Sequence, residues 1–347
     1  MNTRSFLSFL LSSVMILSLA LSPGCNSAKL SDADARMQRG EYFDAAKTYR
    51  KIYNKLTKRE DRPLRGEVAY KMASCYSRLN QFARASAAYQ NAIRYQYPDS
   101  IAYLHLGRSL QAEGKYALAI DAYETFLKFR PGDELALDGV LGCRMAIDAK
   151  GKKKTRYVVK NAKLFNSRRS DFAPMYLDKN FDQIYFTSTN EKVTGTNRSE
   201  ITGMKKGDIY FSKKNEKGEW QRPEPAGGEL NTEFDEGIVS FSPDGQTMYL
   251  TVARRSPVAN TSVEIYTSRR SDATWSAPQK FEITPDTLSA VGHPAVSPDG
   301  KYLYFASDMP GGYGGKDIWR INLQEKGLSI DNMCTQIYTS GNEVFPY

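Results

Sequence analysis

Histidine is almost missing from this chain, which has only His105 and His293 among its 347 residues. Catalysis by serine–histidine or cysteine–histidine pairs needs a histidine beside the nucleophile, and multi-histidine metal sites need several. We therefore predict no enzyme activity, no catalytic residue, no bound metal and no cofactor. No nucleic-acid-binding motif accompanies the net charge of +9, so nucleic acid is also a poor candidate partner.

The apolar stretch at the N-terminus, Phe6–Leu21, has 16 residues, which is short for a membrane span of roughly 20 residues. Arg4 precedes it and Pro23-Gly24-Cys25 follows it. A positive residue, a short apolar core and a small residue before a cleavage point are typical of a secretory signal. We predict a signal peptide over residues 1–24.

Cys25 resembles the lipidated cysteine of a bacterial lipobox, although Ser22 stands where that motif usually has leucine. The resemblance implies that Cys25 carries diacylglycerol at the mature N-terminus and that residues 25–31 form a tether. Asn26–Lys29 lacks the acidic cluster that resembles a surface-export tag, which favours an outer-membrane anchor facing the periplasm. An ordinary secretory signal is the alternative.

Residues 32–149 contain repeats with helical spacing. Gly40, Asn80 and Gly114 each open a similar six-residue block, and Tyr49, Tyr89 and Tyr123 follow at the same spacing. The region resembles the tetratricopeptide-repeat (TPR) family, whose period is 34 residues. The third unit matches the family at these positions: Tyr103, Leu106, Gly107, Leu110, Gly114, Tyr116, Ala119, Tyr123, Phe126 and Pro131. Glu134–Ala149 is expected to be a terminal capping helix.

The TPR resemblance implies a concave groove that binds an extended peptide or a helix. Carried over by position, it predicts this set of groove residues: Tyr70, Ser74, Ser77, Arg78, Leu104, Arg108 and Gln111. The alternative is that these side chains face solvent or a neighbouring domain.

Cysteine is scarce, and Cys75 and Cys143 occupy the same position two repeats apart. Helix spacing of about 10 Å per step separates them by roughly 20 Å, whereas a disulfide needs Cα atoms within about 7 Å. We expect both to be small buried hydrophobic residues.

Residues 150–169 are rich in lysine and arginine, and their sequence contains no aspartate or glutamate. We interpret them as a basic linker, which either contacts phosphate-rich lipid or an acidic partner, or is a solvated hinge.

Residues 170–347 change to a two-residue period with turn signals. Ser242-Pro243-Asp244-Gly245 recurs as Ser297-Pro298-Asp299-Gly300, and Trp220 recurs as Trp275 at the same 55-residue interval. Asp-Gly after proline is typical of tight hairpin turns. The pattern resembles the WD40-like repeats of periplasmic β-propellers, which have four short strands per blade. A β-sandwich, the alternative, would not repeat its turn and tryptophan in phase.

The blade register places Pro174, Val239, Pro294 and Pro346 at one position, so we predict three blades and the start of a fourth. A closed propeller needs at least four blades. We therefore expect this chain to be part of a longer protein or to be completed by another chain.

The order of these regions resembles Bacteroidetes outer-membrane lipoproteins with a TPR, propeller and OmpA-like architecture, associated with type IX secretion and gliding. The resemblance implies an envelope scaffold with protein partners at the groove and the propeller face. An OmpA-like region has no counterpart here, so peptidoglycan binding is not carried over. The expected fold is an all-α TPR solenoid followed by a partial all-β propeller. The alternative function is a surface or periplasmic lipoprotein that binds glycan or peptide.

Overall fold

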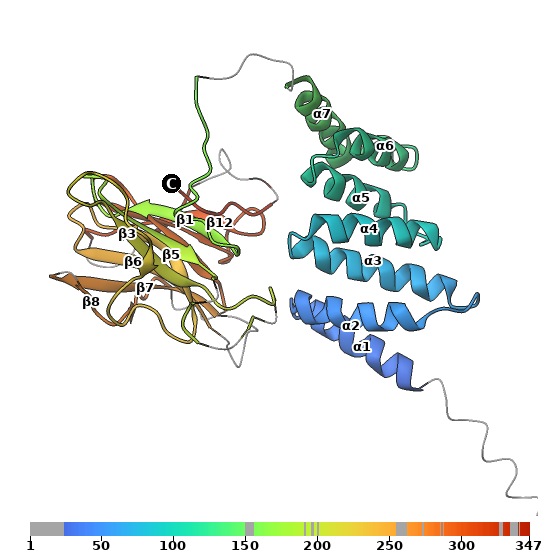
Figure 1. Cartoon of the computed structure of the whole chain (residues 1–347), viewed down its shortest axis with the longest axis horizontal. Helices are drawn as coiled ribbons and strands as arrows, with labels where there is room; N and C mark the ends of the chain where they lie inside the picture. The colour runs from blue at the N-terminus through green and yellow to red at the C-terminus, as the bar shows by residue number, and fades with distance from the viewer. Residues whose placement is uncertain are drawn as a thin grey trace, which may run out of the picture. The chain divides into compact units, whose positions relative to one another are not determined.

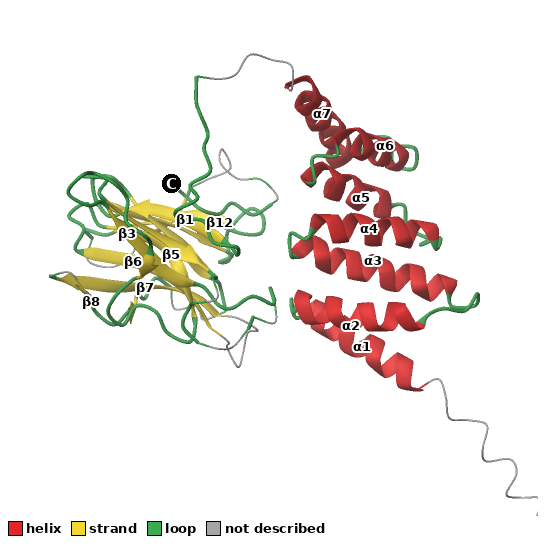
Figure 2. Cartoon of the chain, viewed as in Figure 1, coloured by secondary structure: helices red, strands yellow, loops and turns green. Residues whose placement is uncertain are grey.

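The computed structural model describes most of the chain, and the side chains of residues 24–28 lie outside that description. The described residues are 24–149, 156–190, 192–195, 198–199, 201–254, 262–272, 274–284, 286, 288–325, 329–333, 339 and 341–347. They divide into two compact units, which we call the helical unit and the β unit, with the main boundary between Tyr157 and Val158. Figure 2 shows helices in the first and strands in the second.

The helical unit is a stack of antiparallel helices, in which each helix packs on the next along the chain (Figure 1). The helices are α1 (Gly24–Gln38), α2 (Tyr42–Lys55), α3 (Arg62–Arg78), α4 (Phe82–Arg94), α5 (Ile101–Ala112), α6 (Tyr116–Leu127) and α7 (Glu134–Ala149). The predicted capping helix over Glu134–Ala149 is confirmed.

The turns inside the helix pairs repeat one backbone conformation. Gly40, Asn80 and Gly114 have φ values of +78°, +54° and +74°. A left-handed residue just after a helix turns the chain away from the helix axis, and glycine and asparagine adopt this conformation most readily. The repeated blocks in the sequence therefore mark the points where the first helix of each pair ends.

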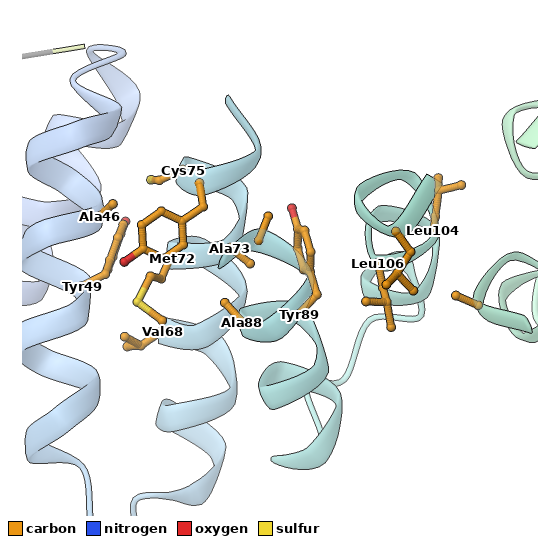
Figure 3. Close-up of a cluster of buried hydrophobic side chains, with 14 of the residues drawn as sticks. Ala46, Tyr49, Val68, Met72, Ala73, Cys75, Ala88, Tyr89, Leu104 and Leu106 are labelled. Carbon is orange, nitrogen blue, oxygen red and sulfur yellow. The ribbon is translucent and has the colours of Figure 1, made fainter. Parts of the chain in front are cut away.

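Three tyrosines fill the space between the helices. Tyr49, Tyr89 and Tyr123 are 0%, 2% and 1% exposed, and Figure 3 shows Tyr49 and Tyr89 among small and aliphatic side chains. A Cβ atom added at Gly107 would lie 2.7 Å from the Tyr123 ring, so α5 can approach α6 this closely only because residue 107 has no side chain.

Cys75 and Cys143 are free and buried in the helical core, as the repeat positions predict. Burial raises the pKa of the Cys75 thiol to about 12, so the thiol is uncharged and packs as a small apolar group.

The described part of the β unit contains three antiparallel sheets, each built from consecutive strands. The first holds β1 (Asp171–Tyr176), β2 (Gln183–Ser188), β3 (Asp208–Lys213) and β4 (Glu224–Pro225). The second holds β5 (Asp235–Phe241), β6 (Thr247–Arg254), β7 (Ser262–Ser271), β8 (Thr274–Trp275) and β9 (Gln279–Lys280). The third holds β10 (Val291–Val296), β11 (Tyr302–Ser307), β12 (Asp317–Asn322) and β13 (Ile330–Asn332).

The first strand of each later sheet packs on the sheet before it. Strand β5 contacts β1, β2 and β3, and β10 contacts β5, β6 and β7. This is the arrangement of successive propeller blades. The predicted fold class, helical TPR-like repeats followed by part of a β-propeller, is confirmed.

The recurring Ser-Pro-Asp-Gly blocks form hairpin turns. Gly245 and Gly300 have φ values of +67° and +71°, and they lie between β5 and β6 and between β10 and β11. In both turns the first serine hydroxyl donates to the aspartate two residues later. The turn residues therefore fix the register of the first hairpin in the second and third blades.

The first strand of every blade has a bulge at the same position. Ala173, Ile238 and His293 lie at the bulges of β1, β5 and β10, and they and Phe345 all have φ between +51° and +58°, although none is glycine. The amide of Ile238 donates to the Thr187 hydroxyl at 2.9 Å, and the amide of His293 donates to the Thr251 hydroxyl at 2.9 Å. A threonine on one blade thus holds the strained residue of the next blade in place.

Residues 341–347 are held against the third blade by a hydrogen bond that matches one between the second blade and the first. The Glu343 amide donates to the Lys316 carbonyl at 2.7 Å, as the Glu236 amide donates to the Gly207 carbonyl at 3.0 Å. The Phe345 amide donates to the His293 ring at 3.3 Å, because the position of Thr187 and Thr251 is Ala306 in the third blade.

Candidate functional site

The predicted groove residues lie on the first helices of the second and third helical pairs. Tyr70, Ser74 and Ser77 are half-buried on α3, and Gln111 is half-buried on α5. Residues separated by three or four positions lie on one side of a helix. We call this surface of α3 and α5 the α3/α5 face, and its two exposed charged residues are Arg78 and Arg108.

Leu104 does not belong to this surface. It was expected in the groove, but it is 3% exposed and packs in the helical core, where Figure 3 shows it beside Leu106. Burial of the apolar leucine side chain is favourable, whereas its exposure to water is not. The prediction that Leu104 faces a ligand is therefore wrong.

An aromatic cluster underlies the α3/α5 face. The rings of Tyr70 and Tyr97 stack with centroids 4.3 Å apart and planes 8° from parallel. His105 lies 5.7 Å from the Tyr89 ring and 6.1 Å from the Tyr70 ring, measured between centroids. Neither Tyr97 nor His105 is among the groove residues predicted from the repeat positions. Tyr97 comes from the turn between α4 and α5, where helical spacing gives no information.

Two predicted groove residues are hydrogen-bonded to buried tyrosines. The hydroxyls of Ser74 and Tyr89 lie 3.2 Å apart, and the Tyr123 hydroxyl donates to Oε1 of Gln111 at 2.6 Å. These bonds satisfy hydroxyl groups that would otherwise be buried without partners, and they fix the tyrosine rings. Ser74 and Gln111 therefore support the face from beneath.

Arg78 and Arg108 bring positive charge to the His105 side of the α3/α5 face. Burial lowers the pKa of His105, and the charges of Arg108 and Arg78 lower it further, so the imidazole is neutral at pH 7. Among the described residues, neither Arg78 nor Arg108 has an ion-pair partner. Two unpaired guanidinium groups near one neutral imidazole suit an anionic group on a ligand.

The β unit has a large apolar cavity of its own, about 770 Å³, along the first strands of the blades. Its walls include Pro174, Val239 and Pro294, which the predicted register aligned. His293 also lines it and stacks on Phe345 with ring centroids 4.2 Å apart. Burial and the Lys316 charge lower the pKa of His293 to about 4, so its ring nitrogen stays free to accept the Phe345 amide at neutral pH.

Two buried aspartates at equivalent positions in the first and third blades stabilise the fold by accepting backbone hydrogen bonds. Asp208 and Asp317 are 0% and 1% exposed, and each accepts a backbone amide at 2.6 Å, from Thr194 and Tyr313 respectively. In the described ranges, no group of three or more histidine, cysteine or acidic side chains is arranged to hold a metal ion. None of the helices that the structure describes has the length and apolar character to span a membrane.

The predicted lipidation site, Cys25, lies outside the described side chains, and Lys150–Thr155 of the predicted basic linker lies outside the described residues. The rest of that linker, from Arg156 to Arg169, is described and contains no helix or strand.

A stack of helix pairs with left-handed turn residues and buried tyrosines defines a helical-repeat unit. Residues 70–134 match the tetratricopeptide-repeat family. No curated protein matches the chain.

Solved structures resemble the helical part. The first TPR of Spaghetti (RPAP3), bound to an HSP90 peptide, is 22% identical, with 35% of this chain and 93% of that chain covered and a TM-score of 0.31. The Sgt2 TPR domain from Aspergillus fumigatus is 20% identical, with 40% and 89% covered and a TM-score of 0.31. The Arabidopsis OM64 TPR domain is 16% identical, with 35% and 94% covered and a TM-score of 0.30.

Proposed function

We propose that the chain is a non-enzymatic scaffold whose α3/α5 face binds a peptide segment through an acidic side chain or a C-terminal carboxylate. The observation that carries this proposal is the pair of exposed, unpaired arginines, Arg78 and Arg108, whose charges both act on the His105 ring of the aromatic cluster. Guanidinium groups form charge-assisted, often bidentate hydrogen bonds with carboxylates, and stacked aromatic rings offer a rigid apolar contact.

His105 adds a neutral hydrogen-bonding group to the same face. A protonated imidazole would add a third positive charge, whereas a neutral one has one donor and one acceptor nitrogen. Among the described residues the His105 ring has no hydrogen-bond partner, so it can donate to a ligand. The face therefore combines charge recognition with aromatic contact.

The test is affinity selection from a library of short peptides with free C-terminal carboxylates, repeated with the amidated library. The intact chain should enrich peptides with acidic groups. Arg78→Glu with Arg108→Glu should lower affinity for the selected peptides at least about tenfold, because each charge-assisted bond contributes roughly 1.5–3 kcal/mol.

The matched control is Arg50→Glu with Arg94→Glu, which changes the charge of the helical unit by the same amount at two exposed positions on α2 and α4. Exposed substitutions change stability by under about 0.5 kcal/mol each, so both variants should keep their helical circular dichroism. Equal peptide binding by the two double variants would show that the α3/α5 face is not the binding surface.

We extend the proposal to location: an outer-membrane lipoprotein that faces the periplasm and serves type IX secretion or a related envelope complex. The supporting features are the apolar stretch Phe6–Leu21, the lipobox-like Cys25 and the order of the repeat regions. Two acyl chains suffice for stable membrane attachment. A fatty-acid analogue should label the wild-type chain in cells and leave Cys25→Ser unlabelled, and equal labelling of both would exclude this anchor.

A further inference from the structure

A basic cavity in the β unit has no role in the proposed function. It has a volume of about 500 Å³ and lies beside the segment 164–168, β2 and β3. Three cationic side chains line it, from separate parts of the chain: Arg168 before β1, Lys192 after β2 and Arg222 before β4.

These cations lack counter-ions among the residues that the structure describes. Among the described residues, none of Arg168, Lys192 and Arg222 has an ion-pair partner. The cavity's acidic residue, Asp171, accepts the Ser167 amide at 2.5 Å and the Ser188 hydroxyl at 2.6 Å. Asp171 is thus held in its own hydrogen bonds, and the cavity keeps an excess of two positive charges.

The neutral wall of the cavity is rigid. Tyr210 is buried and donates its hydroxyl to Asn190 at 3.3 Å, and the Asn190 amide donates to the Ser188 hydroxyl at 3.0 Å. Burial raises the pKa of Tyr210, so this ring adds no negative charge at neutral pH. Phe186 is also buried beside it, with ring centroids 6.1 Å apart.

A second cavity of about 310 Å³ adjoins the first and is apolar. The two share Phe165, Asn166, Asp171 and Phe186 as lining residues. The apolar cavity also has the rings of Phe172, Tyr176 and Trp220 in its lining.

Phe165 stands between the two cavities in a fixed orientation. Its ring meets Trp220 edge to face at 5.6 Å between centroids, much as Tyr185 meets the equivalent Trp275 at 6.2 Å in the next blade. Phe165 therefore contacts Trp220 in the way that Tyr185 of the first blade contacts Trp275 of the second blade. A ring held this way separates a charged compartment from an aromatic one.

We propose that these joined cavities bind an amphipathic phosphate monoester, with the phosphate among Arg168, Lys192 and Arg222 and an apolar group of ring size against Phe165 and Trp220. A phosphate monoester carries close to two negative charges above its second pKa of about 6, which balances the excess of two positive charges. Guanidinium groups match phosphate geometry, and apolar rings favour an aromatic enclosure. The phosphate can belong to a soluble molecule or to a lipid headgroup.

The experiment uses phenyl phosphate and inorganic phosphate in calorimetric titrations of the full chain at pH 8. Phenyl phosphate should bind more tightly than inorganic phosphate. Arg168→Gln with Arg222→Gln should weaken both at least about tenfold. The control is Lys217→Gln with Arg269→Gln, which removes the same charge at exposed positions elsewhere in the β unit and should leave binding unchanged.

Phe165→Ala tests the apolar compartment separately. It should reduce the affinity for phenyl phosphate to that for inorganic phosphate. Tryptophan fluorescence reports whether this variant stays folded, and the arginine variants decide the proposal if it does not.

Vesicles of phosphatidic acid, with phosphatidylcholine vesicles as reference, distinguish the two sources. Binding to phosphatidic acid that disappears in Arg168→Gln with Arg222→Gln assigns the site to a lipid headgroup, and phenyl phosphate binding without vesicle binding assigns it to a soluble ligand. Absence of both kinds of binding, or equal binding by the cavity variant and the control variant, overturns the proposal.

Discussion

The two units differ in what is repeated at the places where one repeat packs on the next. In the helical unit the side chains repeat: Tyr49, Tyr89 and Tyr123 are the same residue in the same buried place. In the β unit the backbone repeats, because one left-handed position holds alanine, isoleucine, histidine and phenylalanine in turn. Helices join through their side chains, whereas a blade meets the next partly through backbone amides, and hydrogen bonds of this kind leave the side chain free to vary.

The largest expected effect is the loss of stability when a buried aromatic side chain that recurs in the repeats of each unit is removed. Tyr89→Ala should destabilise the helical unit, and Trp275→Ala the β unit, by about 3–5 kcal/mol, since each removes a buried aromatic ring and leaves a cavity. Helical circular dichroism reports the first. Fluorescence reports the second, because all three tryptophans lie in the β unit.

Each of these variants serves as the control for the other. A fluorescence transition that shifts as far in Tyr89→Ala as in Trp275→Ala would contradict the assignment of these contacts to separate cores.

A smaller effect concerns a buried carboxyl group, Glu236, which lies in the β unit close to the contact between the first two blades. Glu236 is 2% exposed and burial raises its pKa from 4.5 to about 7, against two hydrogen bonds from Thr232. The folded state therefore holds a proton that the unfolded state releases, and stability should fall as pH rises from about 4.5 to 7.

Glu236→Gln should flatten this fall, by up to about 3 kcal/mol between pH 4.5 and pH 8, because glutamine has no proton to lose. Urea unfolding followed by fluorescence at both pH values measures it. Glu216→Gln, at an exposed position, is the control. A slope that stays the same in Glu236→Gln and in the control would show that Glu236 does not titrate in this range.

The smallest effect tests whether the close contact between the first and second blades determines which side chains can occupy positions 187 and 237. A Cβ atom at Gly237 would lie 2.3 Å from the Thr187 hydroxyl oxygen, so Gly237→Ala should cost about 1–3 kcal/mol through overpacking. Thr187→Ala should relieve that overlap, although it removes the bond to the Ile238 amide.

The junction between the third blade and residues 341–347 already has this exchange, with Ala306 where Thr187 stands and Val344 where Gly237 stands. The double variant should thus be more stable than the sum of the single effects, by at least about 0.5 kcal/mol in a double-mutant cycle. Additive effects would mean that the junction does not couple these positions.

The repeat positions carried over from the TPR resemblance predicted most residues of the α3/α5 face. Arg78 and Arg108 are exposed as predicted from their repeat positions, since a helical period fixes which side of a helix a residue occupies. The repeat positions gave a wrong prediction at Leu104, which borders the core. These positions could not predict Tyr97, because it lies in a turn and helical periodicity does not apply there.

What the sequence by itself determined is the order of the two regions, the helix pairs with their turn residues, the buried cysteines and the hairpin turns, since each depends on contacts among residues close in the chain. Only the tertiary structure decided which groups meet across the chain: Tyr70 with Tyr97, His293 with Phe345, and Arg168, Lys192 and Arg222 around one cavity. The last three come from loops, whose positions are set by the sheets they connect and not by any local pattern.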